Sequence, residues 1–511
     1  MIKNILTSIF TAMLATNLFA AGFDIKTSSI IDQPGVEVLG DYKGSWYVVG
    51  FEAAGTLNRP PRYKIFKYAP GFKNGKISPL YESFGEKTLY LESAFINNKI
   101  SMFYAKCGKR EDVSILLDKR DGRRQLPVIM RQDYDPNTLE AIGLPETVFN
   151  EEDEFFAPCA IEISQSPDRS KTAVLFKPYY KQQKYKVMIT DNNTGDVFSK
   201  VFDFKQTKEY WKFVTLAVNN NGTAILETKV REDVITLAAS NATKGQTKYY
   251  LISVNKNSGE KPTSTELVSN TNGAYFIDPS LAALNSGEVV VVCDMYASDK
   301  DASLRSISVT KYDDNLGSTG KQDLQPDGKF AAMAAKYTPL KKGRGFSHLA
   351  TQQILPLQGK NFLLVAEYED TLTNSEKGQP AKVERNYVIT FRLNEGMSVQ
   401  DQQFIAKRQV SSTVGYAFST RAFAKGNDAY LFYNNDWEAD EEHNMNLQCT
   451  KLAAEGGEPV TSKVLNTSND FFTSMERVFP AGDGKLLLTV EKAVDYEDVS
   501  REVKLLEIAP K

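Results

Sequence analysis

Among the residue types that could bind ions or catalyse reactions, acidic side chains are the ones that recur at a regular position in this chain. They follow short apolar runs, often with two or more acids close together. Grouped carboxylates can coordinate Ca²⁺, which takes about six to eight oxygen ligands, or act as the paired acid and base of a glycosidase. The alternative is a solvated or protein-binding surface, because connecting loops face water. These acids are Glu52, Asp112, Glu227, Glu232, Asp233, Asp294, Asp299, Asp301, Glu367, Glu369, Asp370, Asp436, Glu438, Asp440, Glu441, Glu442, Glu491, Asp495, Glu497 and Asp498.

Two compact groups add other residue types. The segment 436–442 places Trp437 inside an acidic loop, and Trp is enriched where one protein surface meets another. Lys341, Lys342 and Arg344 form the one compact basic patch, which is either an anion site or a solvated loop. We therefore predict a ligand or partner surface that draws on Trp437, Asp436, Glu438, Asp440, Glu367, Glu369, Asp370, Lys341, Lys342 and Arg344.

The sequence offers few of the residues that nucleophilic catalysis needs. Serine and cysteine nucleophiles generally need an imidazole base, and the chain holds only His348 and His443. The sequence has no Gly-x-Ser-x-Gly elbow, no HExxH, no CxxC pair and no phosphate loop. We predict no catalytic residue and no cofactor, with Ca²⁺ as the ion that the acids could hold. The open alternative is a carbohydrate-active or calcium-dependent enzyme that uses acids around a central channel.

An internal repeat must position these residues. Apolar runs centred on Tyr47, Met102, Val174, Ile225, Val290, Leu363, Leu431 and Leu487 recur about every 63 residues. Turns rich in Asn, Asp and Gly precede most runs, and a second, more polar hairpin follows several of them. Each unit therefore contains four strands, which is typical of a propeller blade. We predict an all-β protein formed by a single β-propeller of eight blades, or seven if one unit is an irregular insertion.

The ends of the chain predict how the ring closes. The last unit supplies three strands and stops, whereas residues 23–30 form a lone alternating strand. We expect this strand to complete the last blade, which would leave no long open edge. Two segments depart from the repeat, the connection 126–155 with Pro136 and Pro145, and the segment 321–348 with a short helix at 330–335.

The first residues indicate export. Lys3, an apolar run and a small-residue end predict a signal peptide at 1–21, followed by the propeller at 22–511. We expect a periplasmic or extracellular protein with no membrane span. Since 61 basic residues oppose 64 acidic ones, we expect no nucleic acid partner.

Four cysteines are few for an oxidising compartment. Cys107 and Cys159 lie at the facing ends of neighbouring units, so we predict a disulfide between them. Cys293 and Cys449 lie in the middle of strands, where we expect small buried hydrophobic side chains.

One unit resembles a known family. The segment from Ile163 to Phe176, with Ser166, Pro167 and Asp168 at its turn, is similar to the Ser-Pro-Asp-Gly repeat of WD40-like propellers of bacterial envelopes, the type found in the TolB family. The other units match only in pattern, and Arg169 with Ser170 replaces the usual Gly. The resemblance implies a propeller in protein or ligand recognition at the envelope and transfers no functional residue. We therefore expect a non-catalytic binding or scaffold protein whose partner is a protein or a glycan.

Overall fold

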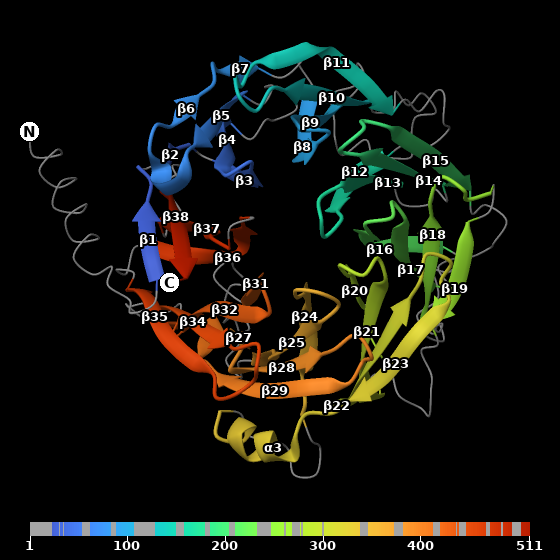
Figure 1. Ribbon diagram of the computed structural model, residues 1–511, viewed down its shortest axis with the longest axis vertical. Helices are drawn as coiled ribbons and strands as arrows, with labels where there is room; N and C mark the ends of the chain where they lie inside the picture. Colours follow the sequence, from blue (N-terminus) through green and yellow to red (C-terminus); the bar gives the residue numbers. More distant parts are fainter. Residues whose placement is uncertain are drawn as a thin grey trace, which may run out of the picture.

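Eight antiparallel sheets, each built on four strands, follow one another around a ring (Figure 1). This computed structural model describes residues 23–29, 31–33, 35–53, 62–82, 88–106, 128–149, 158–178, 184–203, 210–231, 247–259, 262–267, 276, 279–298, 301–337, 346–372, 382–411, 420–435, 437–438, 446–466, 471–481, 484–492 and 502–510. The arrangement confirms the predicted eight-bladed β-propeller.

The first four blades follow the chain in order. Their strands run outward from the centre of the ring, apart from a two-residue strand, β7 (Tyr81–Glu82), that also pairs with β5. Blade 1 holds β3 (Gly35–Tyr42), β4 (Ser45–Ala53), β5 (Arg62–Tyr68) and β6 (Lys76–Ile77). Blade 2 holds β8 (Thr88–Ile96), β9 (Lys99–Lys106), β10 (Val128–Tyr134) and β11 (Ala141–Phe149). Blade 3 holds β12 (Pro158–Gln165), β13 (Lys171–Pro178), β14 (Lys184–Asp191) and β15 (Val197–Asp203), and blade 4 holds β16 (Tyr210–Val218), β17 (Ala224–Arg231), β18 (Thr247–Val254) and β19 (Thr263–Leu267).

The other four blades complete the ring. Blade 5 holds β20 (Ser280–Ala283), β21 (Val289–Ser298), β22 (Asp301–Tyr312) and β23 (Ser318–Leu324), and blade 6 holds β24 (Leu349–Pro356), β25 (Phe362–Tyr368), β28 (Tyr387–Leu393) and β29 (Val399–Ala406). Blade 7 holds β31 (Arg421–Lys425), β32 (Asp428–Asn435), β34 (Asn446–Leu452) and β35 (Val460–Asn466). Blade 8 holds β36 (Phe471–Pro480), β37 (Leu486–Lys492), β38 (Glu502–Pro510) and β1 (Phe23–Thr27).

The second strand of each blade lies in the core. All eight residues that mark the sequence repeat lie on these strands, and none is more than 1% exposed. Neighbouring blades pack face to face, so each second strand is covered on both sides and reads as a continuous apolar run. Val290 and Leu364, for example, share one cluster between blades 5 and 6. The repeat in the sequence is thus a repeat of interblade packing.

The N-terminal strand closes the ring, as the sequence predicts. Strand β1 pairs antiparallel with β38 from Phe23 opposite Pro510 to Thr27 opposite Leu506. The short strand β2 (Ile31–Asp32) extends this pairing. Phe23 packs into the cluster shared by blades 7 and 8. The open edge of β38 is therefore covered by the other end of the chain.

One expectation about the chain is wrong. The segment 126–155, predicted as a connection outside the repeat, contains β10 and β11, the two outer strands of blade 2. Pro136 lies in the turn between them, and Pro145 lies on the outermost strand, where a missing N–H breaks no ladder. The predicted short helix is present as α3 (Gly328–Ala334), capped by the Asp327 side chain.

A small extra sheet lies beside blades 6 and 7. It joins β26 (Asp370–Leu372), β27 (Lys382–Glu384), β30 (Gln409–Ser411) and β33 (Trp437–Glu438). A search of the described residues finds no helix long and apolar enough to cross a membrane.

Candidate functional site

One face of the ring carries the hairpin turns that join the first and second strands of the blades; we call it the hairpin face. Hydrogen bonds at this face, made by these turns and by nearby residues such as Asn192 and Pro510, link each blade to the next. Tyr42 donates to Asn98 (2.9 Å), and Asn192 accepts from the backbone of Asn97 (2.9 Å). The belt continues through Asp168 to Asn220, Asn220 to Asn285, Asn285 to Leu357, Gln358 to Gly426, and Lys425 to Pro510. Trp46 of blade 1 closes it by donating to Glu507 of blade 8 (2.8 Å).

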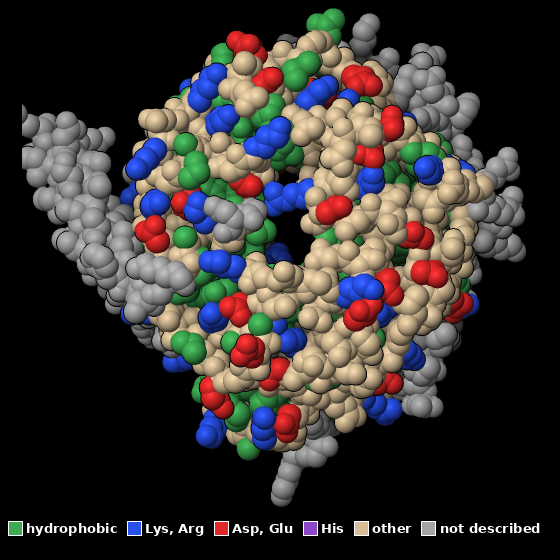
Figure 2. Space-filling view, in the orientation of Figure 1, with side chains coloured by type: hydrophobic (Ala, Val, Ile, Leu, Met, Phe, Trp, Pro, Cys, Tyr) green, Lys and Arg blue, Asp and Glu red, His purple; other side chains and the backbone are tan. Residues whose placement is uncertain are grey.

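A cavity of about 840 Å³ lies at the centre of the ring, against blades 1, 2, 3 and 8. Figure 2 shows the central opening, with basic side chains at its rim. Strands β3 and β8 supply one wall and β12 and β36 contribute at their ends. The lining residues are Glu37, Val38, Leu39, Gly40, Asp41, Tyr42, Lys43, Leu91, Glu92, Ser93, Ala94, Phe95, Asn98, Ile163, Gln165, Arg169, Asn192, Asn193, Phe479 and Pro480.

Aromatic rings and amides form the part of the cavity near the hairpin face. Tyr42 and Phe95 are stacked with centroids 4.9 Å apart, and Tyr47 meets Phe95 edge-on at 5.2 Å. Gln165 donates to the backbone of Phe95 (2.9 Å). Because these groups hold one another, the wall presents fixed polar tips next to apolar ring surface.

Arg169 reaches across this opening from blade 3 to two blades that are not its neighbours. Its guanidinium donates to the backbone carbonyls of Asp41 in blade 1 (3.2 Å) and Pro480 in blade 8 (3.1 Å). The Asp41 carboxylate lies 3.8 Å away, and the Arg169 side chain remains 46% exposed. The cavity mouth therefore holds a half-exposed cation that contacts chiefly uncharged acceptors.

Glu92 and Glu37 lie on the wall farther from the mouth. Burial, followed by the negative charges of Glu37 and Glu162, raises the pKa of Glu92 to about 7. Lys177 partly opposes this shift, but it is already ion-paired with Glu162. Glu37 differs because Tyr90 and Ser93 both donate hydroxyl hydrogen bonds to its carboxylate. Two carboxyl groups in different surroundings thus line one cavity.

Glu367, predicted on a water-facing surface, is fully buried between blades 6 and 7. It forms an ion pair with Lys407, which is also fully buried, and accepts a hydrogen bond from Thr420 (2.9 Å). Burial opposes ionisation of Glu367, but the charges of Lys407 and Arg385 outweigh it, so its pKa is lowered. The group joins two blades and is closed to a ligand.

Two other acids of the recurring set also lie inside strands. Glu227 in β17 is 0% exposed and Asp294 in β21 is 8% exposed. Asp294 accepts from the backbone N–H and the hydroxyl of Thr351 in blade 6, both at 2.7 Å. Burial raises the pKa of Asp294 to about 6, against these two hydrogen bonds. The expectation that these acids form a solvated ring is wrong, because the second strands extend through them.

The remaining predicted site residues are in different positions. Glu369 is ion-paired with Arg385, and Asp370 lies 3.6 Å from His348; both acids are partly exposed. Trp437 and Glu438 lie on β33, whose backbone alone is described. Asp436, Asp440, Lys341, Lys342, Arg344 and His443 lie outside the described residues, and so does the predicted disulfide, since Cys107 and the side chain of Cys159 are not described.

Cys449 is buried and carries a free thiol, and Cys293 is a partly covered free thiol. Within the described residues, no group of three or more His, Cys, Asp or Glu side chains is placed to hold a metal ion. Sequence reasoning missed Glu37, Glu92 and the cavity itself. The available signal was Arg169, a bulky residue in a turn position where the resembled family has Gly.

Comparisons with known proteins find only distant likenesses. No protein-family model matches the chain, and no curated protein matches it significantly. Similar solved structures include a post-proline cleaving enzyme from Rickettsia typhi, with 10% identity and a TM-score of 0.39 over 97% of this chain and 61% of that one. Another is an ulvan lyase of a new polysaccharide lyase family, with 10% identity and a TM-score of 0.36 over 88% of this chain and 96% of that one.

A third is the β-propeller domain of the Trilobed protease from Pyrococcus furiosus, with 8% identity and a TM-score of 0.34 over 87% of this chain and 97% of that one. The chain spans 56 to 61% of the length of the three prolyl-cleaving enzymes that it matches. At these identities the likeness concerns architecture and says nothing about chemistry. The class is defined by the sheet topology: an eight-bladed β-propeller with a cavity at its central opening.

Proposed function

We propose that this protein is an exported, non-catalytic recognition module that binds a saccharide chain in the central cavity. The observation that carries the proposal is the lining of that cavity by stacked Tyr42 and Phe95 beside the amides of Asn98, Gln165 and Asn192. A sugar ring offers an apolar C–H face and hydroxyl edges, which match an aromatic surface with adjacent donors and acceptors. A volume of about 840 Å³ has room for a few sugar units.

Rigidity supports binding at this place. The amide of Asn98 donates to the Asn192 carbonyl (3.2 Å) and its oxygen accepts from Tyr42 (2.9 Å), so neighbouring blades fix the tips that a ligand would meet. A preformed site avoids the cost of ordering side chains on binding. Blades 1, 2 and 3 all contribute, so a ligand here would contact three separate units of the ring.

Exposed apolar residues favour this reading over a large protein-docking surface. The large hydrophobic side chains that are exposed among the described residues include Ile77, Leu144, Val197, Val399 and Val460. They lie on β6, β11, β15, β29 and β35, the outer strands of five different blades. Protein interfaces concentrate such residues in one patch, whereas these are dispersed around the ring.

A binding measurement tests the proposal. The mature protein is applied to an array of plant and bacterial oligosaccharides, with and without a calcium chelator, and hits are titrated by calorimetry. Tyr42→Ser should weaken binding at least about tenfold by removing the stacked wall. Tyr337→Ser, a control at an exposed tyrosine beyond α3, should leave affinity unchanged. Equal affinity of the two variants, or no saccharide bound, would refute the cavity as the site.

A second candidate function is saccharide cleavage, and Glu92 is the observation that favours it. A carboxyl group with a pKa of about 7 can donate a proton near neutrality, and Glu37, which also lines the cavity, accepts a hydrogen bond from Ser93. New reducing ends or unsaturated products from a bound oligosaccharide would establish cleavage. Glu92→Gln and Glu37→Gln should then abolish product formation while Tyr337→Ser does not.

A further inference from the structure

We propose that Arg169 determines the ligand preference of the cavity by receiving a carboxylate group of the ligand at the channel mouth. The inference of a carboxylate stands on Arg169 and its surroundings. Only the assignment of that carboxylate to a saccharide rests on the function proposed above.

The backbone of Arg169 lies where arginine is unfavourable. Its φ is 59°, in the left-handed region that glycine adopts without strain. A non-glycine residue is strained there. Strained residues persist where the side chain has a use, and the resembled turn repeat has Gly at this place. Arg169 thus keeps its side chain although its backbone conformation is strained.

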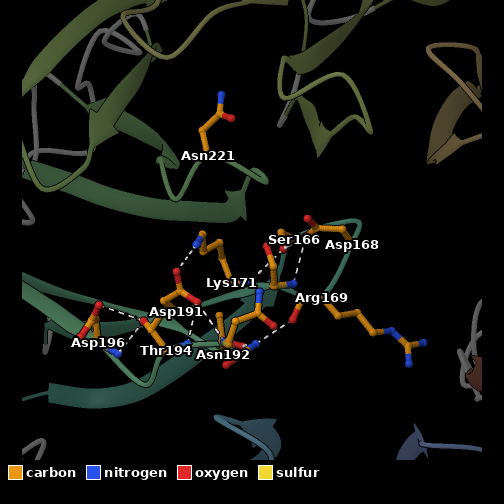
Figure 3. A network of polar contacts seen from close by, with 12 residues as sticks. Ser166, Asp168, Arg169, Lys171, Asp191, Asn192, Thr194, Asp196 and Asn221 are labelled. Carbon is orange, nitrogen blue, oxygen red and sulfur yellow. Dashed lines mark hydrogen bonds and ion pairs between the residues drawn. The ribbon is translucent and has the colours of Figure 1, made fainter.

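A polar network locks the turn in this conformation (Figure 3). Asp168 accepts from the Ser166 hydroxyl (2.6 Å) and the Ser170 backbone (2.9 Å). Asn192, from the next turn of the same blade, donates to the Arg169 carbonyl (2.8 Å). Figure 3 shows the Arg169 side chain extending away from the labelled residues of this network. The guanidinium is therefore preorganised over the opening.

Its present partners are replaceable. The two carbonyl oxygens at 3.1 and 3.2 Å are uncharged, and the Asp41 carboxylate at 3.8 Å is beyond a normal hydrogen bond. A ligand carboxylate could accept two parallel N–H bonds from the planar guanidinium, which is a stronger, charge-assisted arrangement. The half-exposed side chain leaves an approach for such a group.

The charges along the wall agree with an anionic group at the mouth. Lys43 also lines the cavity at the hairpin turn of blade 1. Glu37 precedes Asp41 by four residues on one strand, a separation of roughly 13 Å along β3. Glu37 and Glu92 therefore lie away from Arg169, and the acid that a ligand carboxylate would meet at the mouth is Asp41, whose largely buried carboxylate lies 3.8 Å from the guanidinium.

The test compares three probes by calorimetry: a galacturonic acid tetramer, a neutral galactose tetramer and tetraglutamate. Wild type is compared with Arg169→Gly, Arg169→Lys and Lys463→Gln. Lys463 is an exposed cation on β35, so its variant controls for loss of charge alone. Glycine suits the turn, so the melting temperature of Arg169→Gly should be held or raised, and lost binding will not reflect misfolding.

We expect wild type to prefer the galacturonic acid tetramer over the neutral one by at least about tenfold. Arg169→Gly should abolish this preference with little change in binding of the neutral tetramer, Arg169→Lys should keep part of it, and Lys463→Gln should keep all of it. A preference that survives Arg169→Gly, or equal binding of both tetramers by wild type, overturns the role of Arg169 and leaves saccharide binding in place. Arg169-dependent binding of tetraglutamate alone supports carboxylate recognition and refutes the saccharide. Binding of none of the probes refutes both.

Discussion

Two carboxylates in this protein show how differently a propeller can treat a buried charge. Glu367, between blades 6 and 7, is paired with buried Lys407, and Arg385 lies 3.9 Å away. Glu92, on the cavity wall, faces the charges of Glu37 and Glu162, and its opposing cation Lys177 is already paired. The pKa of Glu367 is lowered, whereas the pKa of Glu92 is raised to about 7.

The difference distinguishes a carboxylate that stabilises the fold from one whose charge is not fully balanced by the protein. A buried carboxylate that is paired with a cation of the protein itself holds two blades together. It is not available to a ligand. A carboxylate left partly uncompensated lowers the stability of the protein, which is common at binding and catalytic sites. The same residue type thus joins two blades in one part of the ring and lacks a full counter-charge on the cavity wall in another.

Breaking the pair of Glu367 and Lys407 should have the largest effect on stability. Lys407→Met leaves Glu367 buried without its main partner, and we expect a loss of about 3 to 5 kcal/mol in the free energy of unfolding, measured by urea at pH 7. The double variant with Glu367→Gln should recover most of this loss. If the single variant costs under about 1 kcal/mol, the two carboxylates do not differ as described.

An intermediate case is Asp294, which is buried with hydrogen bonds but without a contacting cation among its described partners. Thr351→Val removes the hydroxyl donor and should cost about 1.5 kcal/mol at pH 8, where Asp294 is ionised. The cost should shrink at pH 5, below the raised pKa of about 6. A cost independent of pH would show that the hydroxyl contributes only packing.

Removing the uncompensated charge should stabilise the protein. Because the folded pKa of Glu92 is raised from 4.5 to about 7, the folded state binds more protons than the unfolded state between these values. Stability therefore falls as pH rises through this range. Glu92→Gln should be more stable than wild type by about 1 kcal/mol at pH 8, allowing for the solvent that reaches the side chain, and equal at pH 4. Urea unfolding at both pH values measures this, and a destabilised variant at pH 8 would contradict it.

The smallest effect is expected at the surface. Lys360 and Glu395 form an ion pair in which both side chains are more than half exposed. Water screens such pairs, so Lys360→Gln should leave the melting temperature within error. A clear drop would mean that exposure does not separate the pairs of this protein as we describe.

The repeat of apolar runs was enough to predict the eight blades and most of their strands, because packing between blades repeats with the chain. It was insufficient for the acids, because their partners lie far away along the chain. Glu367 and Lys407 are 40 residues apart in the chain, and Asp294 and Thr351 are 57 apart. Strands β10 and β11 were not predicted, because Pro136 at a turn and Pro145 at a sheet edge resemble breaks in a strand pattern.

The cavity could not be predicted from the sequence either, since four blades line it and blade 8 is far from the other three in the chain. Arg169 alone carried a local sign of it, as a substitution within a recognisable turn. Its reach to blades 1 and 8 depends on the radius of the ring, which no local pattern specifies.

The pairing of β1 with β38 sets an order of events during folding. Strand β1 can find its partner only after β38 has emerged, with more than 450 residues between them in the chain. The other seven blades can form before blade 8 is complete. Until β1 and β38 pair, each has a bare edge able to pair with another chain, so newly made protein should be most prone to misassociation at this stage.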